Sequence, residues 1–229
     1  EYDNKKMKCS NGSNGKDEGA CASFRRLHLC NKNMVKMDTN NNDGKAKHKL
    51  LAEVCMAAKY EGDSIKTHYT IHKETYSDSA AELCTVLARS FADIGDIVRG
   101  RDLYRGGNTK EKEKRKQLEE NLKEIFKNIY GNLNGAKARY KGDTDNYYKL
   151  REYWWELNRE TVWKAITCSA AGGNNYFRQT CGGDNEKNST LARDKCRCQK
   201  KNGSPDDQVP TYFDYVPQYL RWFEEWAED

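Results

Sequence analysis

Nine cysteines constrain the folding of this 229-residue chain more than any other feature of its sequence. They are scattered along the chain and do not form the two Cys-x-x-Cys pairs of a zinc module, so their spacing favours a disulfide framework. A chain stapled in this way is typical of an oxidising, extracellular setting. Because the count is odd, one thiol lacks a partner within the sequence. We therefore interpret the chain as a fragment of a longer protein whose next segment supplies the missing cysteine.

The composition predicts a folded, mainly helical chain with polar loops. Charged residues make up 33% and hydrophobic residues 36%, yet the 11% of aromatic residues argues against a disordered polymer. No apolar run approaches the roughly 18 residues that span a bilayer, so we expect no direct membrane insertion by this piece. The net charge of +5 favours anionic partners only where cations cluster, and it does not by itself indicate nucleic acid.

Hydrophobic periodicity predicts a helical bundle and no substantial sheet. Apolar residues recur at spacings of three and four over residues 45–60, 79–100, 110–133, 143–168 and 217–227. Gly62 is expected to stop the first helix, and Ser79 with Glu82 forms a capping-box pattern at the start of the second. The first 45 residues and residues 169–210 are rich in glycine, asparagine and cysteine, which indicates loops ordered by disulfides.

Motifs for catalysis, cofactors and metals are missing from the sequence. There is no phosphate-binding loop, no zinc-protease motif and no serine-hydrolase elbow, so we predict neither an enzyme nor a cofactor. His68 and His72 have a spacing that can hold a metal, but no third ligand is close in sequence. We interpret them as surface histidines and predict no metal site.

Basic residues form three dense groups, which are the strongest candidates for a binding site. The groups are Arg99, Arg101 and Arg105; Lys110, Lys112, Lys114, Arg115 and Lys116; and Lys137, Arg139 and Lys141. Such density predicts charge-assisted binding of an anion such as a sulfated glycan. The alternative is a solvated helix start, because Glu111 and Glu113 interleave with the second group and neutralise part of it.

The aromatic residues of the later helices have two interpretations. Tryptophans and a tyrosine at helical spacing are typical of a core, although such rings also form stacking platforms for bases or sugars. We predict that the following aromatic residues are buried in the core: Tyr153, Trp154, Trp155, Trp163, Trp222, Trp226 and also Phe91.

Three segments of the sequence resemble one known family. These are Leu87-Ala88-Arg89-Ser90-Phe91-Ala92-Asp93-Ile94-Gly95-Asp96-Ile97-Val98-Arg99-Gly100, then Leu150-Arg151-Glu152-Tyr153-Trp154-Trp155 with Asn158-Arg159 and Val162-Trp163-Lys164-Ala165-Ile166-Thr167-Cys168, and Tyr215-Val216-Pro217-Gln218-Tyr219-Leu220-Arg221-Trp222-Phe223-Glu224-Glu225-Trp226. They resemble the Duffy-binding-like domain, in the alpha class that opens the variant erythrocyte membrane protein of the falciparum malaria parasite. The resemblance extends from about Cys9 to Asp229.

The resemblance implies a fold and a function. Domains of this family are disulfide-linked, mainly α-helical adhesion modules of three subdomains without enzymatic activity. Residues 1–62 are then a loop-rich, disulfide-stapled first subdomain with one helix, residues 63–229 are a helical-bundle second subdomain, and the third subdomain is absent from this chain.

The implied function is adhesion to host cells. The domain would be exported to the extracellular face of the infected erythrocyte and would bind red-cell or endothelial receptors, or sulfated or blood-group glycans. It would take part in rosetting, cytoadherence and antigenic variation. Its further partners would be the adjacent interdomain region and host antibodies. The alternative is a structural spacer in a multidomain head whose neighbouring domain binds the receptor.

The resemblance also implies disulfide pairs. It joins Cys84 to Cys168 and Cys21 to Cys30, which leaves Cys9 with Cys55. Among Cys181, Cys196 and Cys198 we expect one pair and one leftover thiol.

Overall fold

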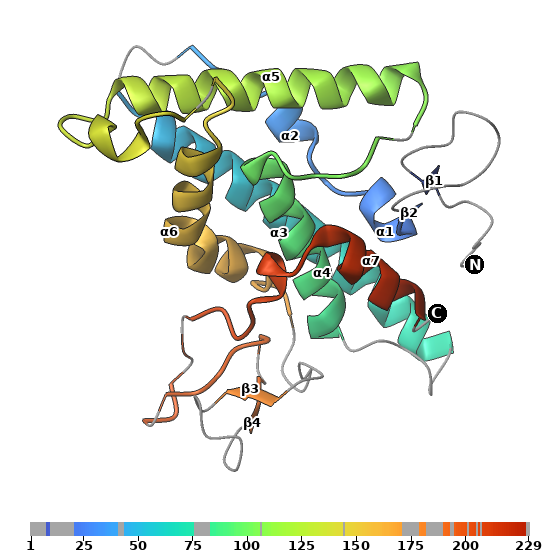
Figure 1. The fold of residues 1–229 in the computed structure, drawn as a ribbon. Coiled ribbons are helices and arrows are strands. Elements are labelled where there is room, and N and C mark those ends of the chain that lie inside the picture. The colour runs from blue at the N-terminus through green and yellow to red at the C-terminus, as the bar shows by residue number, and fades with distance from the viewer. Residues whose placement is uncertain are drawn as a thin grey trace.

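Helices form nearly all the regular structure in this computed structural model (Figure 1). The residues described are 8–9, 21–40, 44–75, 83–105, 107–143, 145–170, 179–181, 190–192, 195–200, 202–204, 206 and 208–227. The α-helices are α1 (Phe24–Leu27), α2 (Lys32–Val35), α3 (Ala46–Thr75), α4 (Leu83–Arg99), α5 (Thr109–Gly131), α6 (Tyr148–Ile166) and α7 (Gln218–Ala227), with 3₁₀ helices η2 (Lys137–Tyr140) and η4 (Phe213–Tyr215). The strands are β1 (Lys8–Cys9), β2 (Cys21–Ala22), β3 (Gln179–Cys181) and β4 (Thr190–Leu191).

The strands are a minor part of the fold. β1 pairs with β2 and β3 pairs with β4, each as an antiparallel two-stranded sheet. The predicted mainly α fold without substantial sheet is therefore confirmed in the described part of the chain.

Helix α3 is the long element against which α2, α4, α5 and α6 pack. It runs through residue 62 without a break, so the predicted stop at Gly62 is wrong. A side chain at Gly62 would overlap the backbone carbonyl of Ile166 at the end of α6. Position 62 requires a residue without a side chain, because the end of α6 approaches the α3 backbone closely. The division of the chain into subdomains at residue 62 stays a proposal.

Helix α4 forms the centre of the hydrophobic core. Nearly all of its residues are buried, and Phe91 lies 5.1 Å from the ring centres of both Trp155 and Trp163 on α6. Phe91 and Trp163 are 0% exposed and Trp154 is 5% exposed, so their predicted core function is confirmed. Trp155 and Trp222 are also buried.

Two members of the predicted aromatic core are exposed instead. Tyr153 lies on the outer side of α6, and Trp226 lies near the end of α7. For these two residues the core prediction is wrong, because helical spacing alone does not say which face of a wide apolar helix meets solvent.

The remaining helix boundaries show how local side chains set the ends. Asn108 and Glu111 close a reciprocal capping box that begins α5. Helix α6 begins at Tyr148 rather than at Asp143, because Tyr147 has a left-handed backbone with φ of 55°. The Asp143 carboxylate instead accepts hydrogen bonds from the first-turn amides of α6. The predicted capping box of Ser79 and Glu82 lies outside the described residues.

The disulfides differ from the expected pairs. Cys84 at the start of α4 bonds to Cys196, and Cys181 bonds to Cys198. Cys168 is an exposed free thiol, so the predicted Cys84–Cys168 pair is wrong. Cys84 is buried, and the backbone carbonyl of Cys196 is held nearby in the core by the indole of Trp163 at 3.2 Å.

The two predicted pairs of the N-terminal region are also wrong. Cys30 and Cys55 are both free, whereas Cys21 is disulfide-bonded. Cys30 lies beside α3, where its backbone amide donates to the Glu61 carboxylate at 2.9 Å. Of the three later cysteines, Cys181 and Cys198 form the expected pair, but Cys196 is bonded to Cys84 and is not a leftover thiol.

Candidate functional site

The first predicted basic group lies at the end of α4, and its members have different environments. Arg99 is 1% exposed, and its guanidinium donates to the Asp96 carboxylate at 2.9 Å and to the Asp214 carbonyl. The interior already uses its charge, so Arg99 is not exposed for a glycan contact, and the role of this group stays a prediction. Arg101 is 59% exposed and pairs with Glu152 at 2.9 Å, and Arg105 is exposed.

Arg99 belongs to a buried network of ion pairs that holds α1 and α7 against α4. The carboxylate of Asp93, which is fully buried, accepts hydrogen bonds from Arg25 at 2.7 Å and from Arg221 at 2.8 Å. Arg221 also bonds to Asp96, and thus joins the two carboxylates of α4. Because every one of these groups has a partner inside the protein, the network fixes the helices and offers no free charge to a ligand.

The two aspartates of this network have shifted pKa values of opposite sign. Burial would raise the pKa of Asp93, but the nearby charges of Arg25 and Arg221 hold it at about 2. Burial raises the pKa of Asp96 to about 6, and the charges of Arg221 and Arg99 offset this only in part. Both shifts follow from structural ion pairing, and neither group lies in a hollow where it could act on a substrate.

A second buried network fixes the segment before α7. Asp214 accepts hydrogen bonds from the Trp155 indole at 2.8 Å and from the Arg159 guanidinium at 2.6 Å. Arg159 also donates to the Thr211 carbonyl at 2.7 Å. These contacts attach η4 to α6.

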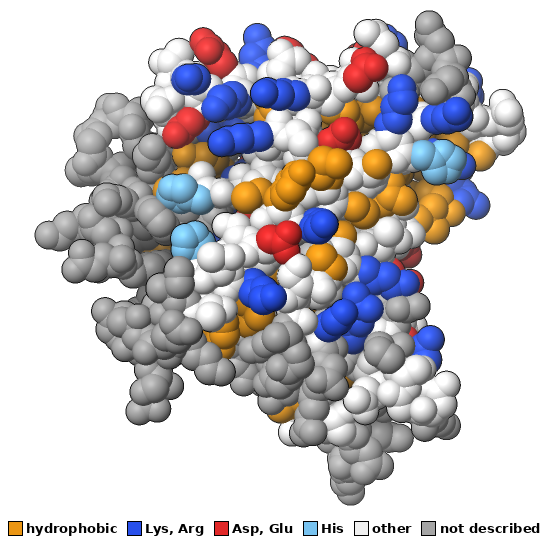
Figure 2. Space-filling view, turned by 180° about the vertical axis from the view of Figure 1, so that it is seen from behind, with side chains coloured by type: hydrophobic (Ala, Val, Ile, Leu, Met, Phe, Trp, Pro, Cys, Tyr) orange, Lys and Arg blue, Asp and Glu red, His pale blue; other side chains and the backbone are white. Residues whose placement is uncertain are grey.

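The second predicted basic group begins α5 and is largely exposed. Lys110, Lys112, Lys114 and Lys116 are exposed, and Lys116 makes a weak pair with Glu120 at 3.8 Å. Arg115 differs, because its guanidinium packs 4.6 Å from the ring centre of Tyr104. Figure 2 shows Lys and Arg side chains gathered with some Asp and Glu along the upper edge, where Figure 1 places α5.

The third predicted group is at the far end of α5. Lys137, Arg139 and Lys141 are exposed in and beside η2, and two of them lie over tyrosine rings. The 15 residues from Lys116 to the end of α5 at Gly131 separate this group from the second by roughly 22 Å along the helix axis. The structure therefore brings the first two groups near each other, with Arg115 donating to the Arg105 carbonyl at 3.0 Å, and leaves the third apart.

Two hollows lie elsewhere on the surface. One, of about 450 Å³, is lined by Glu152, Glu156, Arg159, Glu160, Tyr212 and Tyr215. Its exposed charge is acidic, because Arg159 is already paired with Asp214, so it does not suit a polyanion.

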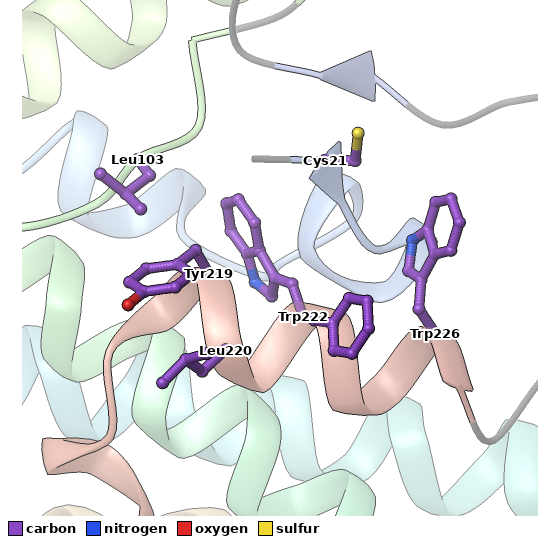
Figure 3. A pocket seen from close by; sticks show the side chains of 7 residues that line it. Cys21, Leu103, Tyr219, Leu220, Trp222 and Trp226 are labelled. Carbon is purple, nitrogen blue, oxygen red and sulfur yellow. The ribbon is translucent and has the colours of Figure 1, made fainter. Parts of the chain in front are cut away.

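The other hollow, of about 580 Å³, is apolar and was not predicted from the sequence. It is lined by Cys21, Leu103, Tyr219, Leu220, Trp222, Phe223 and Trp226. Figure 3 shows the rings of Trp222 and Trp226 pointing from α7 to the side where Cys21 and Leu103 lie. Phe223 is 71% exposed, which leaves this face of α7 open to solvent. The sequence signal that could have revealed it is the set of apolar residues at closely spaced positions of α7, Leu220, Trp222 and Phe223, which are too many for one helix face.

Metal ligands do not cluster in the described part of the chain. No group of three or more His, Cys, Asp or Glu side chains is arranged to hold a metal ion there. His68 is exposed, and the side chain of His72 lies outside the described residues. Among the helices that the structure describes, none has the length and apolar character needed to cross a membrane.

Residues 19–221 match the family of the Duffy binding domain. The chain belongs to this family. Duffy-binding domains of the adhesin type are not enzymes, in agreement with the prediction of no catalytic function. No curated protein sequence matches the chain closely enough to count as a relative.

Solved structures give the same family with more detail. The NTS-DBL1-alpha and CIDR-gamma double domain of PfEMP1 from the varO strain of Plasmodium falciparum is 42% identical, with a TM-score of 0.74 over 99% of this chain and 31% of that chain. The NTS-DBL1(alpha-1) domain from the same strain is 40% identical, with a TM-score of 0.73 over 99% of this chain and 48% of that one. This chain thus spans about a third to a half of the length of these relatives.

A third structure is a complex. The DBLbeta domain of PfEMP1 IT4var13 bound to ICAM-1 is 32% identical, with a TM-score of 0.69 over 97% of this chain and 47% of that chain.

The buried networks involve the segments that resemble the family. The segment that contains Asp93, Asp96 and Arg99 and the segment that contains Arg221 carried the sequence resemblance, and the structure joins them through ion pairs. These ion pairs therefore connect two segments that are far apart in the sequence.

Proposed function

We propose that this Duffy-binding domain is a host-cell adhesion module on the surface of the infected erythrocyte, and that it binds a sulfated glycan through the exposed lysines of α5. The observation that carries the proposal is the state of Lys110, Lys112 and Lys114. All three are exposed, and none forms an ion pair with a residue that the structure describes. Cations in this state are available to an anionic ligand at little desolvation cost.

The relatives support the adhesion part of the proposal. Solved members of the family include a PfEMP1 domain bound to ICAM-1, so host receptors are a reasonable class of partner for this chain. The solved double domain of varO PfEMP1 makes an adjacent CIDR region a second expected neighbour. Host antibodies are the third expected partner, because the proposed location exposes the domain to plasma.

A spacer function is the second candidate, favoured by the open apolar face of α7. A module that only positions its neighbours needs such contact surfaces and no free cation. In that case a neighbouring domain would bind the receptor.

Retention on immobilised heparin and binding to uninfected red cells test the proposal. We expect the 229-residue chain to be retained on heparin at physiological salt, not to be retained on neutral dextran, and to label red cells in flow cytometry. Because exposed ion contacts are screened over roughly 8 Å at this salt, retention should fall steeply as salt increases. Absence of binding to both heparin and red cells by the folded chain would leave the spacer function.

A further inference from the structure

We propose that Lys112, Lys116, Lys123 and Lys127 form one binding surface, the lysine stripe, which holds a linear sulfated polysaccharide parallel to the axis of α5. This proposal rests on the proposed function above and assigns its site. With about 3.6 residues per turn, the four lysines lie within about 60° of one another around the helix. At about 1.5 Å per residue they extend over about 22 Å. Lys123 and Lys127 were not among the cations predicted from the sequence.

The stripe lies on the solvent side of the helix. The buried residues of α5 are Leu118, Asn121, Leu122, Ile125, Phe126 and Ile129. By helical geometry the centre of this buried face is about 140° from the stripe. The side chains of Lys116 and Lys127 are 78% and 64% exposed, Lys112 is exposed, and Lys123 is half-buried.

The one carboxylate that would interrupt the stripe is paired with a buried arginine. Glu119 lies on the same face of the helix, between Lys116 and Lys123. Both oxygens of Glu119 accept hydrogen bonds from Arg151, at 3.0 Å and 3.1 Å, and the Arg151 side chain is fully buried. The charge of Glu119 is thus neutralised from inside the protein, and the lysines on either side remain available.

Two further carboxylates lie at the edge of the stripe and compete only weakly. Glu120 is 3.8 Å from Lys116, and Glu124 is 3.4 Å from Lys127. All four side chains are well exposed, so each pair is weak and a sulfate can displace the carboxylate.

The arrangement selects the class of ligand. Lysines four residues apart are about 6 Å apart along the axis and those seven residues apart about 10 Å, which suits an extended polyanion and not a compact phosphate. Neither of the two hollows described above includes a residue of α5. Within the described part, α5 has no large hydrophobic side chain among the exposed ones. Single-stranded nucleic acid would therefore find charge but no ring on which to stack its bases.

Other lysines supply a matched control. Lys47 and Lys59 lie on α3, and Lys149 lies on α6. Lys200 lies in the loop after β4, and all four are exposed and lie outside α5. Replacing these four changes the net charge as much as replacing the stripe does.

The experiment compares two quadruple variants of the full chain. The stripe variant carries Lys112→Gln, Lys116→Gln, Lys123→Gln and Lys127→Gln, and the control carries Lys47→Gln, Lys59→Gln, Lys149→Gln and Lys200→Gln. Glutamine is a good helix former, so both should fold, as circular dichroism and the unfolding midpoint will show. Affinity is measured for a heparin dodecasaccharide, a heparin tetrasaccharide and single-stranded poly(dT) over a salt series.

The expected result separates the two variants. The stripe variant should lose about tenfold or more in affinity for the dodecasaccharide and show a smaller salt dependence, because it lacks the contacting cations. The control should stay within about threefold of the parent. The parent should bind the dodecasaccharide more tightly than the tetrasaccharide, which is too short to contact all four lysines.

Three results would overturn the inference. Equal losses in the two variants would show attraction by net charge, and a larger loss in the control would place the site elsewhere. Tighter binding of poly(dT) than of the dodecasaccharide would overturn the ligand class. In each of these cases the parent still binds heparin, so the proposed function stands; failure of the parent to bind heparin at all would refute the glycan part of the proposed function as well.

Discussion

Positive charge has opposite environments in two regions of this Duffy-binding domain. Along α4 and α7 the cations are arginines such as Arg99 and Arg221, which are buried against carboxylates. Along α5 they are mostly lysines in contact with water, such as Lys112. The planar guanidinium forms several directed hydrogen bonds at once, which suits interior ion pairs, whereas the ammonium of lysine is strongly hydrated. A dense basic segment is therefore evidence of a binding surface only where its members are not already paired inside the protein.

The sharpest way to test this comparison is to change two arginines at the same helix end. Arg99 and Arg101 both bond to Glu152, but only Arg99 is buried. We expect Arg99→Met to lower the free energy of unfolding by about 3–5 kcal/mol, because it leaves Asp96 with less compensation in the interior. Arg101→Met should cost less than about 1 kcal/mol. Urea unfolding of the two variants and the parent gives both values.

Equal costs for the two arginine variants would contradict the comparison. They would show that the residue type, and not burial, sets the contribution of these ion pairs. A methionine at each position keeps most of the side-chain volume, so the difference reports the lost charge more than a cavity.

A smaller effect is expected from pH, and it separates the two aspartates of the network. The pKa of Asp93 is lowered from 3.8 to about 2, so this group adds stability as the pH rises between about 2 and 4. The pKa of Asp96 is raised from 3.8 to about 6, so the folded state binds the proton more tightly and stability falls as the pH rises between about 4 and 6. This fall should be on the order of 2 kcal/mol.

The variant Asp96→Asn should lack that fall. We expect the stability difference between the variant and the parent to shift in favour of the variant as the pH increases from about 4 to 6, since only the parent ionises a buried carboxyl there. Unfolding by urea at both pH values measures it. A pH-independent difference would mean that Asp96 titrates normally, and that its arginine partners offset its burial fully.

The smallest effect is expected on the surface of α5. Lys116 is 78% exposed and its pair with Glu120 is long, at 3.8 Å. We expect Lys116→Met to change the free energy of unfolding by less than about 0.5 kcal/mol. A loss above about 1 kcal/mol, measured by the same urea unfolding, would show that the lysines of α5 also support the fold and are not free for a ligand.

The helices could be predicted from the sequence because their signal is local. Apolar residues at spacings of three and four identified α4, α5, α6 and α7 to within a few residues at the ends that the structure describes. The end of α3 is the exception. Gly62 is a helix breaker by propensity, yet it lies within α3 because it faces the end of α6, and that contact is invisible in a linear pattern.

The disulfides and the burial of Arg99 could not be predicted for a related reason. The partner of Cys84 is 112 residues away, and several pairings satisfy the same spacing. Arg99 follows an apolar helix face and precedes a glycine, as a solvent-exposed capping arginine also would. Its burial depends on Asp214 and Tyr215, which reach it from the far end of the chain. The exposed lysines in the first turns of α5 were found from sequence alone, because amphipathic periodicity gives the side that faces water, whereas Lys127 was missed.

The two disulfides of the late loop have a consequence for how this protein can change over time. Cys181 and Cys198 close a loop at its base, and Cys196 fastens the same base to the first turn of α4. Insertions or deletions between Cys181 and Cys196 would alter a loop whose two ends are already held in place. Doubling the length of such a loop costs only about 0.6 kcal/mol of free energy through the entropy of loop closure. The surface at this loop can therefore change in outline while the helices beneath keep one shape.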